Sequence, residues 1–65
     1  MIKEEIFNIL RQKYNLRVVI SDKIGTRIVN VERWVQRKSV PKWYHDQFVN
    51  IIESELHISK NEIEC

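Results

Sequence analysis

Apolar residues at helical spacing lie on both sides of the only glycine in this chain, and this arrangement limits the fold more than any other feature. Ile20 and Ile24 stand four residues apart before Gly25, so they share one face of a helix. Beyond the glycine the helical repeat consists of Ile28, Val31, Trp34 and Val35. Because glycine readily adopts the left-handed conformation that ends helices, we predict a break at residues 25–27 and a second helix over 28–37.

The segment Leu16–Ile20 favours a strand by local propensity, since it ends in three β-branched residues. A lone strand would leave its backbone groups without partners, and no second strand is evident in the sequence. We therefore predict a helix that ends at Gly25. The alternative is one continuous helix from Ser21 to Arg37, in which Gly25 would cost about 1 kcal/mol.

Two amphipathic helices are predicted to flank the central pair. Residues 2–13 carry apolar side chains at helical spacing, and Asn15 is a suitable stop. Residues 41–56 repeat in the same way after Pro41, which suits the first turn of a helix. Residues 59–62 have the Ser-x-x-Glu form of a capping box and predict one last short turn. No linker interrupts the chain, so we expect a single all-α domain over residues 1–65.

A chain of 65 residues is close to the lower size limit for a domain that folds alone. Its small core leaves little material for the walls of a catalytic pocket, so we expect no enzyme and no small-molecule substrate. His45, His57 and Cys65 lack the paired spacing of a zinc site, and we expect no metal or cofactor. No apolar run is long enough to span a membrane and no export leader is evident, so we expect a cytoplasmic protein.

Charge is distributed unevenly along the chain. Residues 17–42 carry seven basic and two acidic side chains, a net charge of +5. Residues 43–65 carry one basic and five acidic side chains, a net charge of −4. A basic segment followed by an acidic one indicates a protein that orients itself on a polyanion.

The central segment resembles the helix-turn-helix of Cro/CI-type phage regulators and their XRE relatives over about residues 17–56. The matching positions are Ile20-Ser21, Ile24-Gly25, Val31-Glu32-Arg33-Trp34 and Arg37-Lys38-Ser39-Val40-Pro41. The resemblance implies a domain of four to five short helices and a sequence-specific regulator of transcription that binds double-stranded DNA, in the first place a Cro-like repressor of a phage or mobile element. The second helix of the central pair would then enter the major groove.

On that resemblance, base readout is expected from Arg27, Ile28, Val29, Glu32, Arg33 and Gln36, while Val31, Trp34 and Val35 face the core. Arg33 could form two hydrogen bonds with a guanine, or it could pair with Glu32 or a phosphate. Glu32 could accept from cytosine or orient an arginine. Ile28 either packs on thymine methyl groups or belongs to the core.

The same resemblance assigns phosphate contacts to Arg17, Asn30, Arg37, Lys38 and Lys42. Such contacts supply affinity without sequence information. One recognition helix covers few base pairs, so we expect a homodimer that is weak in solution and completed on DNA. Its candidate interface contains Trp43, Ile58 and Ile63.

Two other functions are compatible with the sequence. An excisionase-like or architectural DNA-binding factor also uses short basic helices, and it would bend several adjacent sites. A small protein-interaction module would use the basic face to bind an acidic partner, and it would not distinguish between DNA sequences.

Overall fold

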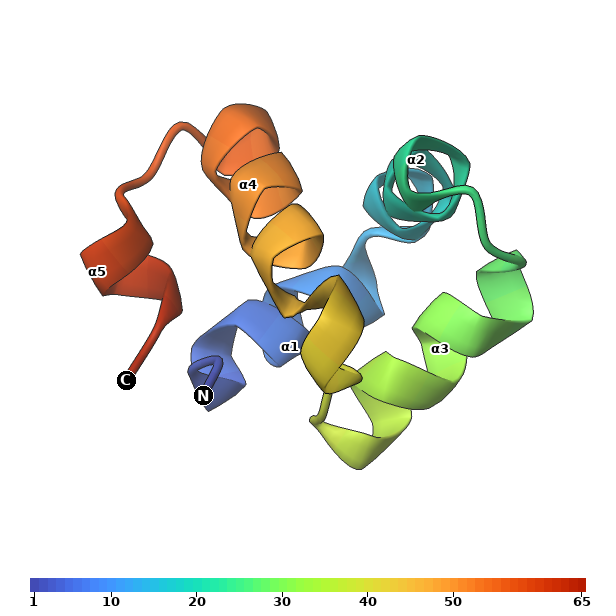
Figure 1. Cartoon of the computed structure of the whole chain (residues 1–65), viewed down its shortest axis with the longest axis horizontal. Helices are drawn as coiled ribbons and strands as arrows, with labels where there is room; N and C mark the ends of the chain where they lie inside the picture. The colour runs from blue at the N-terminus through green and yellow to red at the C-terminus, as the bar shows by residue number, and fades with distance from the viewer.

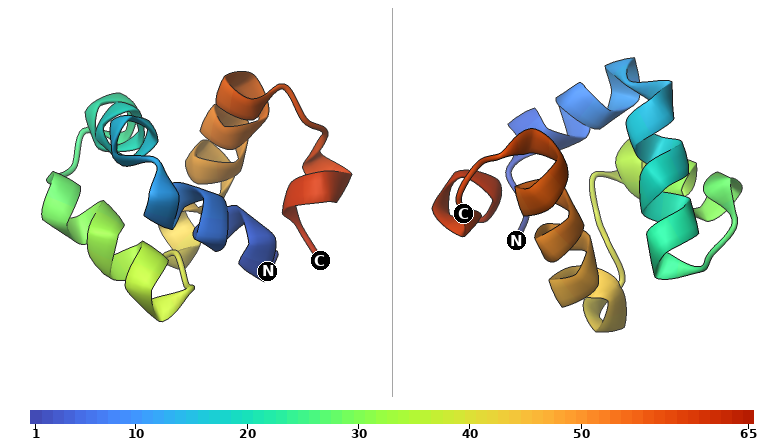
Figure 2. Two further views of the ribbon diagram at one scale, coloured as in Figure 1. Left: turned by 180° about the vertical axis from the view of Figure 1, so that it is seen from behind. Right: turned by 90° about the horizontal axis from the view of Figure 1, so that it is seen from above.

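The computed structural model describes residues 1–65, and its regular elements are all helical. They are α1 (Glu4–Gln12), α2 (Tyr14–Ile24), α3 (Ile28–Arg37), the 3₁₀ turn η1 (Lys42–Tyr44), α4 (His45–Leu56) and α5 (Lys60–Ile63). Figure 1 shows α3 and α5 on opposite sides of the molecule with α4 between them, and the reverse view in Figure 2 agrees. The predicted all-α class is confirmed.

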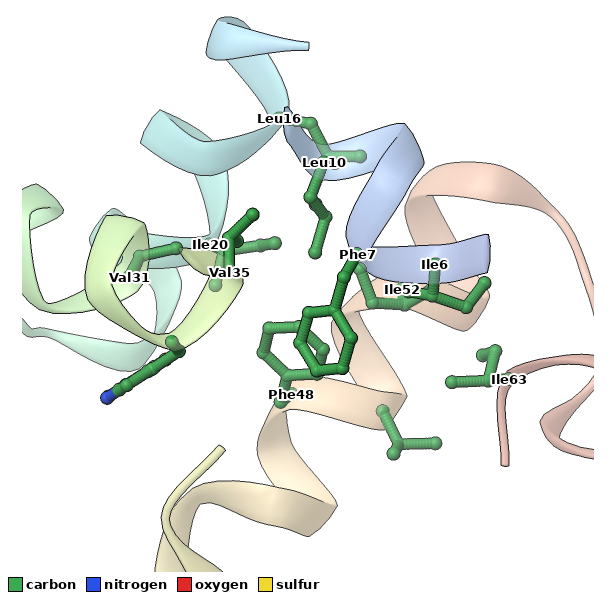
Figure 3. Close-up of a cluster of buried hydrophobic side chains, with 12 residues drawn as sticks. Ile6, Phe7, Leu10, Leu16, Ile20, Val31, Val35, Phe48, Ile52 and Ile63 are labelled. Atoms are coloured by element: carbon green, nitrogen blue, oxygen red, sulfur yellow. The ribbon is translucent and has the colours of Figure 1, made fainter. Parts of the chain in front are cut away.

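One core joins all five α-helices. Its twelve buried apolar side chains are Ile6, Phe7, Leu10, Leu16, Ile20, Val31, Trp34, Val35, Phe48, Val49, Ile52 and Ile63. Phe7 of α1 and Phe48 of α4 lie at its centre with their ring centroids 6.3 Å apart (Figure 3). Close packing of this kind makes each helix depend on the others for its position.

The break at Gly25 and the helical state of Leu16–Ile20 are both as predicted. α2 runs through the β-branched segment because its buried face supplies Leu16 and Ile20 to the core. Tertiary burial here outweighs the local preference for a strand. In Figure 1, α2 is seen nearly along its axis while α3 lies across the view, so the chain changes direction sharply between them.

The predicted limits of the first helix are wrong at both ends. Ile2 lies outside α1 because it forms an isolated antiparallel bridge with Glu64, in which the Lys3 N–H donates to the Ile63 carbonyl at 2.7 Å. Asn15 lies inside α2 and does not stop a helix. The break is Lys13 alone, whose extended backbone (φ −114°, ψ 90°) separates α1 from α2.

The C-terminal predictions are correct in outline only. A helix follows Pro41, but its first turn is the 3₁₀ segment η1, so that α4 begins at His45. The short helix after Ser59 is present as α5, although the Ser59 side chain makes no capping hydrogen bond. The Glu62 N–H instead donates to the backbone oxygen of Ser59 at 3.0 Å.

Candidate nucleic-acid interface

The turn between α2 and α3 is fixed by backbone conformation and short hydrogen bonds. Gly25 is left-handed (φ 82°, ψ 34°). The N–H groups of Gly25 and Thr26 both donate to the Ser21 carbonyl, at 2.9 and 3.0 Å. The Asn30 side-chain amide donates to the Thr26 hydroxyl at 2.9 Å, which ties the first turn of α3 to the connection. The start of α3 is therefore held in one position.

α3 has one buried and one exposed face. Val31, Trp34 and Val35 lie in the core, as predicted. Val29, Glu32, Arg33 and Gln36 are exposed together on the opposite side, which we call the α3 solvent face. A helix with three buried anchors can present such a face rigidly.

Ile28 and Val29 occupy different environments at the start of α3. Val29 is 44% exposed, whereas Ile28 is half-buried and is not among the side chains that pack on the core. The expectation that Ile28 could belong to the core is therefore not met. Val29 thus stands at the N-terminal end of the α3 solvent face, and the half-buried Ile28 lies beside it toward the buried side of the helix.

Cations without ion pairs gather around α3. Four of the eleven Lys and Arg side chains form ion pairs with carboxylates, and the other seven are Lys3, Arg11, Lys13, Arg27, Arg33, Arg37 and Lys42. Arg27 is the N-cap of α3, and Arg33 and Arg37 belong to the helix itself. Lys42 begins η1, the next helical element after α3. By contrast, Asp46, Glu53 and Glu62 lie without ion pairs on α4 and α5. Three of the five carboxylates without ion pairs thus lie on α4 and α5, and the other two are Glu5 on α1 and Asp22 on α2.

Three of the side chains that were predicted to contact phosphates already bond to other groups of the protein. The Lys38 ammonium pairs with Glu4, and this hydrogen bond together with the charge lowers the pKa of the Glu4 carboxyl. The Asn30 amide is bonded to Thr26, as described above. The Arg17 guanidinium donates to the Leu10 carbonyl at 2.6 Å, and its side chain is only 15% exposed. Arg37 and Lys42 remain exposed and free of ion pairs.

Arg11 is not among the predicted contacts, yet it lies beside the α3 solvent face. It lines a hollow between the end of α1 and α3 together with Arg17, Glu32, Val35 and Gln36. Its own side chain is exposed and forms no ion pair. The packing of α1 against α3 brings it there, and no motif in the sequence could have located it.

The candidate dimer surface requires a correction. Ile63 is fully buried in the core, because α5 folds back against α1 and α4, so it cannot belong to an interface. Ile58 is half-buried and packs on the same core. Trp43 alone is freely accessible, at 77% exposed, and its ring lies 6.3 Å from that of Tyr44.

The remaining polar groups form no other recognisable site. No cluster of three or more His, Cys, Asp or Glu side chains has the geometry to hold a metal ion. His45 and Glu64 form a hydrogen bond of 2.7 Å, which lowers the pKa of the Glu64 carboxyl. None of the helices combines the length and the apolar composition needed to span a bilayer.

Comparisons with protein-family models, with curated proteins and with solved structures found no match.

Proposed function

We propose that this protein is a sequence-specific regulator of transcription that binds double-stranded DNA through α3, in the manner of a Cro-like repressor. The observation that carries the proposal is the α3 solvent face, which stands on three buried anchors beside a rigid turn and is bordered by unpaired cations. A two-helix unit of this kind fits the major groove, and the surrounding positive charge attracts phosphates.

Base readout is assigned to the exposed residues of α3. Arg33 has no ion pair and can donate both ends of its guanidinium to guanine O6 and N7. Gln36, one turn further along, can form the equivalent pair of hydrogen bonds with adenine. Val29 and the half-buried Ile28 can contact thymine methyl groups, so we expect a site that contains A·T pairs.

Phosphate contacts are assigned to cations that the fold leaves unpaired. Arg37 and Lys42 follow α3, and Arg27 precedes it as the N-cap, so these three cations border the helix at both ends. Base readout was expected of Arg27, and we propose a phosphate contact for it instead. Arg11 joins them from the end of α1. The acidic surface of α4 and α5 would face away from DNA, since α5 lies on the other side of the molecule from α3.

We further propose that two copies bind an inverted repeat. Each well-read base pair contributes about 1 to 3 kcal/mol of discrimination, and a single α3 covers too few of them to select one site in a genome. Trp43 is the most exposed aromatic side chain, at 77%, and it follows Lys42 directly, so we assign it as the anchor for contact between copies. Half-sites should lie about 10 to 10.5 base pairs apart.

Selection of bound duplexes from a random pool, repeated at two salt concentrations, tests the proposal. We expect a recovered consensus with two-fold symmetry, a two-protein complex on it, and affinity that falls steeply with salt. Recovery of bent arrays of adjacent sites would favour an architectural factor. Binding that ignores sequence, or no binding at all, would refute the proposal and favour a module for acidic protein partners.

A further inference from the structure

Arg17 connects three helices through one side chain. It belongs to α2, and its Nη1 donates to the carbonyls of Leu10 and Arg11 in the last turn of α1, at 2.6 and 2.9 Å. These carbonyls belong to the C-terminal end of α1, where the Leu10 carbonyl also accepts from the Lys13 N–H at 3.3 Å. The guanidinium carbon also lies 5.4 Å from the centre of the Tyr14 ring. The side chain is thereby fixed before any ligand is present.

A second nitrogen of Arg17 lies near α3. Its Nε is buried, makes no hydrogen bond, and lies 3.7 Å from the Glu32 Oε2 atom. Glu32 follows the buried Val31 and is 44% exposed, so its carboxylate sits at the edge of the α3 solvent face. A buried N–H without a partner strongly favours the nearest anion, and Glu32 is the carboxylate that forms an ion pair with Arg17.

We propose that Arg17 is a positioning residue that holds the Glu32 carboxylate against α2, so that neither side chain contacts DNA directly. This inference rests on the proposed function for its effect on binding. Without Arg17, the Glu32 carboxylate would be free to approach the phosphates and bases, where it would repel the former and favour cytosine among the latter. Base readout then belongs to Arg33 and Gln36, which have no such restraint.

Three variants test the inference on a selected duplex. Arg17→Gln should weaken binding roughly two- to tenfold and shift base preference toward cytosine at one position. Adding Glu32→Gln to that variant should restore both the affinity and the original preference, because the released carboxylate is gone. Glu32→Gln alone should leave base preference unchanged. In none of the three variants should the slope of the logarithm of the binding constant against the logarithm of the salt concentration change by as much as one phosphate contact contributes.

Other outcomes would overturn the inference. If Arg17 contacts a phosphate, Arg17→Gln should lower the salt slope by about one, and Glu32→Gln should not restore binding. If Glu32 reads a base, Glu32→Gln alone should flatten the preference at one position. Lys23→Gln is the matched control, since Lys23 is also on α2 and pairs with Glu55 of α4 at 3.4 Å, away from α3. It should change binding by less than about twofold.

A measurement without DNA separates this inference from the proposed function. In a double-mutant cycle on urea unfolding, Arg17→Gln and Glu32→Gln should be coupled by roughly threefold or more in the unfolding constant. The exposed pair Lys23 and Glu55 should be coupled by less than about twofold. Equal, weak coupling in both pairs would contradict the positioning role even if the protein binds DNA. If Arg17 and Glu32 are strongly coupled but the protein binds no DNA, Arg17 still holds Glu32 between α2 and α3, and only the proposed function is refuted.

Discussion

Replacement of Gly25 by alanine distinguishes a broken helix pair from one continuous helix. The two arrangements predict changes of opposite sign in the free energy of unfolding. Gly25 has a φ of 82° and ψ of 34°, a left-handed conformation that alanine adopts only with strain. A Cβ built at this position would have no heavy atom within 4 Å. The substitution therefore introduces no steric clash, and its effect comes from the backbone alone.

The magnitude follows from two opposing backbone contributions. An L-residue in the left-handed helical region costs about 1 to 2 kcal/mol. Alanine also has fewer accessible conformations than glycine in the unfolded chain, which stabilises the folded state by about 0.4 to 1 kcal/mol. Gly25→Ala should thus lower the free energy of unfolding by about 1 kcal/mol. In a continuous helix from Ser21 to Arg37, the same change would raise it by about 1 kcal/mol.

Urea unfolding followed by circular dichroism measures this difference. With a slope of about 1 kcal/mol/M for a small domain, Gly25→Ala should move the midpoint down by about 1 M. His57 provides the reciprocal control, because it is an exposed non-glycine residue at φ 55°. His57→Gly should be more stable than His57→Ala, since both remove the imidazole and only glycine relieves the left-handed strain. A stabilised Gly25→Ala would refute the broken-helix account.

Three further predictions concern the core, acid stability and base readout. Ile63→Ala should cost about 2 to 5 kcal/mol in urea unfolding because Ile63 is fully buried, whereas Trp43→Ala should stay within about 0.5 kcal/mol. The hydrogen bond from His45 lowers the pKa of Glu64, so its stabilisation is present above the ordinary value of 4.5 and is lost as the pH falls through the lowered pKa. In the Glu64→Gln variant, the urea midpoint of unfolding should therefore fall less on acidification than it does in the unmodified protein. Arg33→Ala should cost about 1 to 3 kcal/mol on the selected duplex and flatten the preference at one base pair in a competition assay.

The helices were predictable where apolar periodicity and backbone chemistry agree. Gly25 marks the end of α2 because the left-handed conformation favours glycine, and the spacing of Val31, Trp34 and Val35 identifies the buried face of α3. The same spacing places Arg33 on the exposed side. These inferences need only local geometry, so one sequence suffices for them.

Long-range pairing was not predictable from the sequence. The bridge between Ile2 and Glu64 joins the two ends of the chain, and it determines where α1 begins and why Ile63 is buried. Arg17 looks like a free surface cation until α1 and α3 are placed around it. In each case the environment is created by contacts between helices, and no local pattern encodes it.

We propose that the α3 solvent face binds DNA, and backbone amide spectra of the protein titrated with the selected duplex locate the bound surface residue by residue. The largest chemical-shift changes should occur at Val29, Arg33 and Gln36, with the amides of α4 and α5 little changed. Larger changes on α4 and α5 than on α3 would show that DNA does not bind through α3.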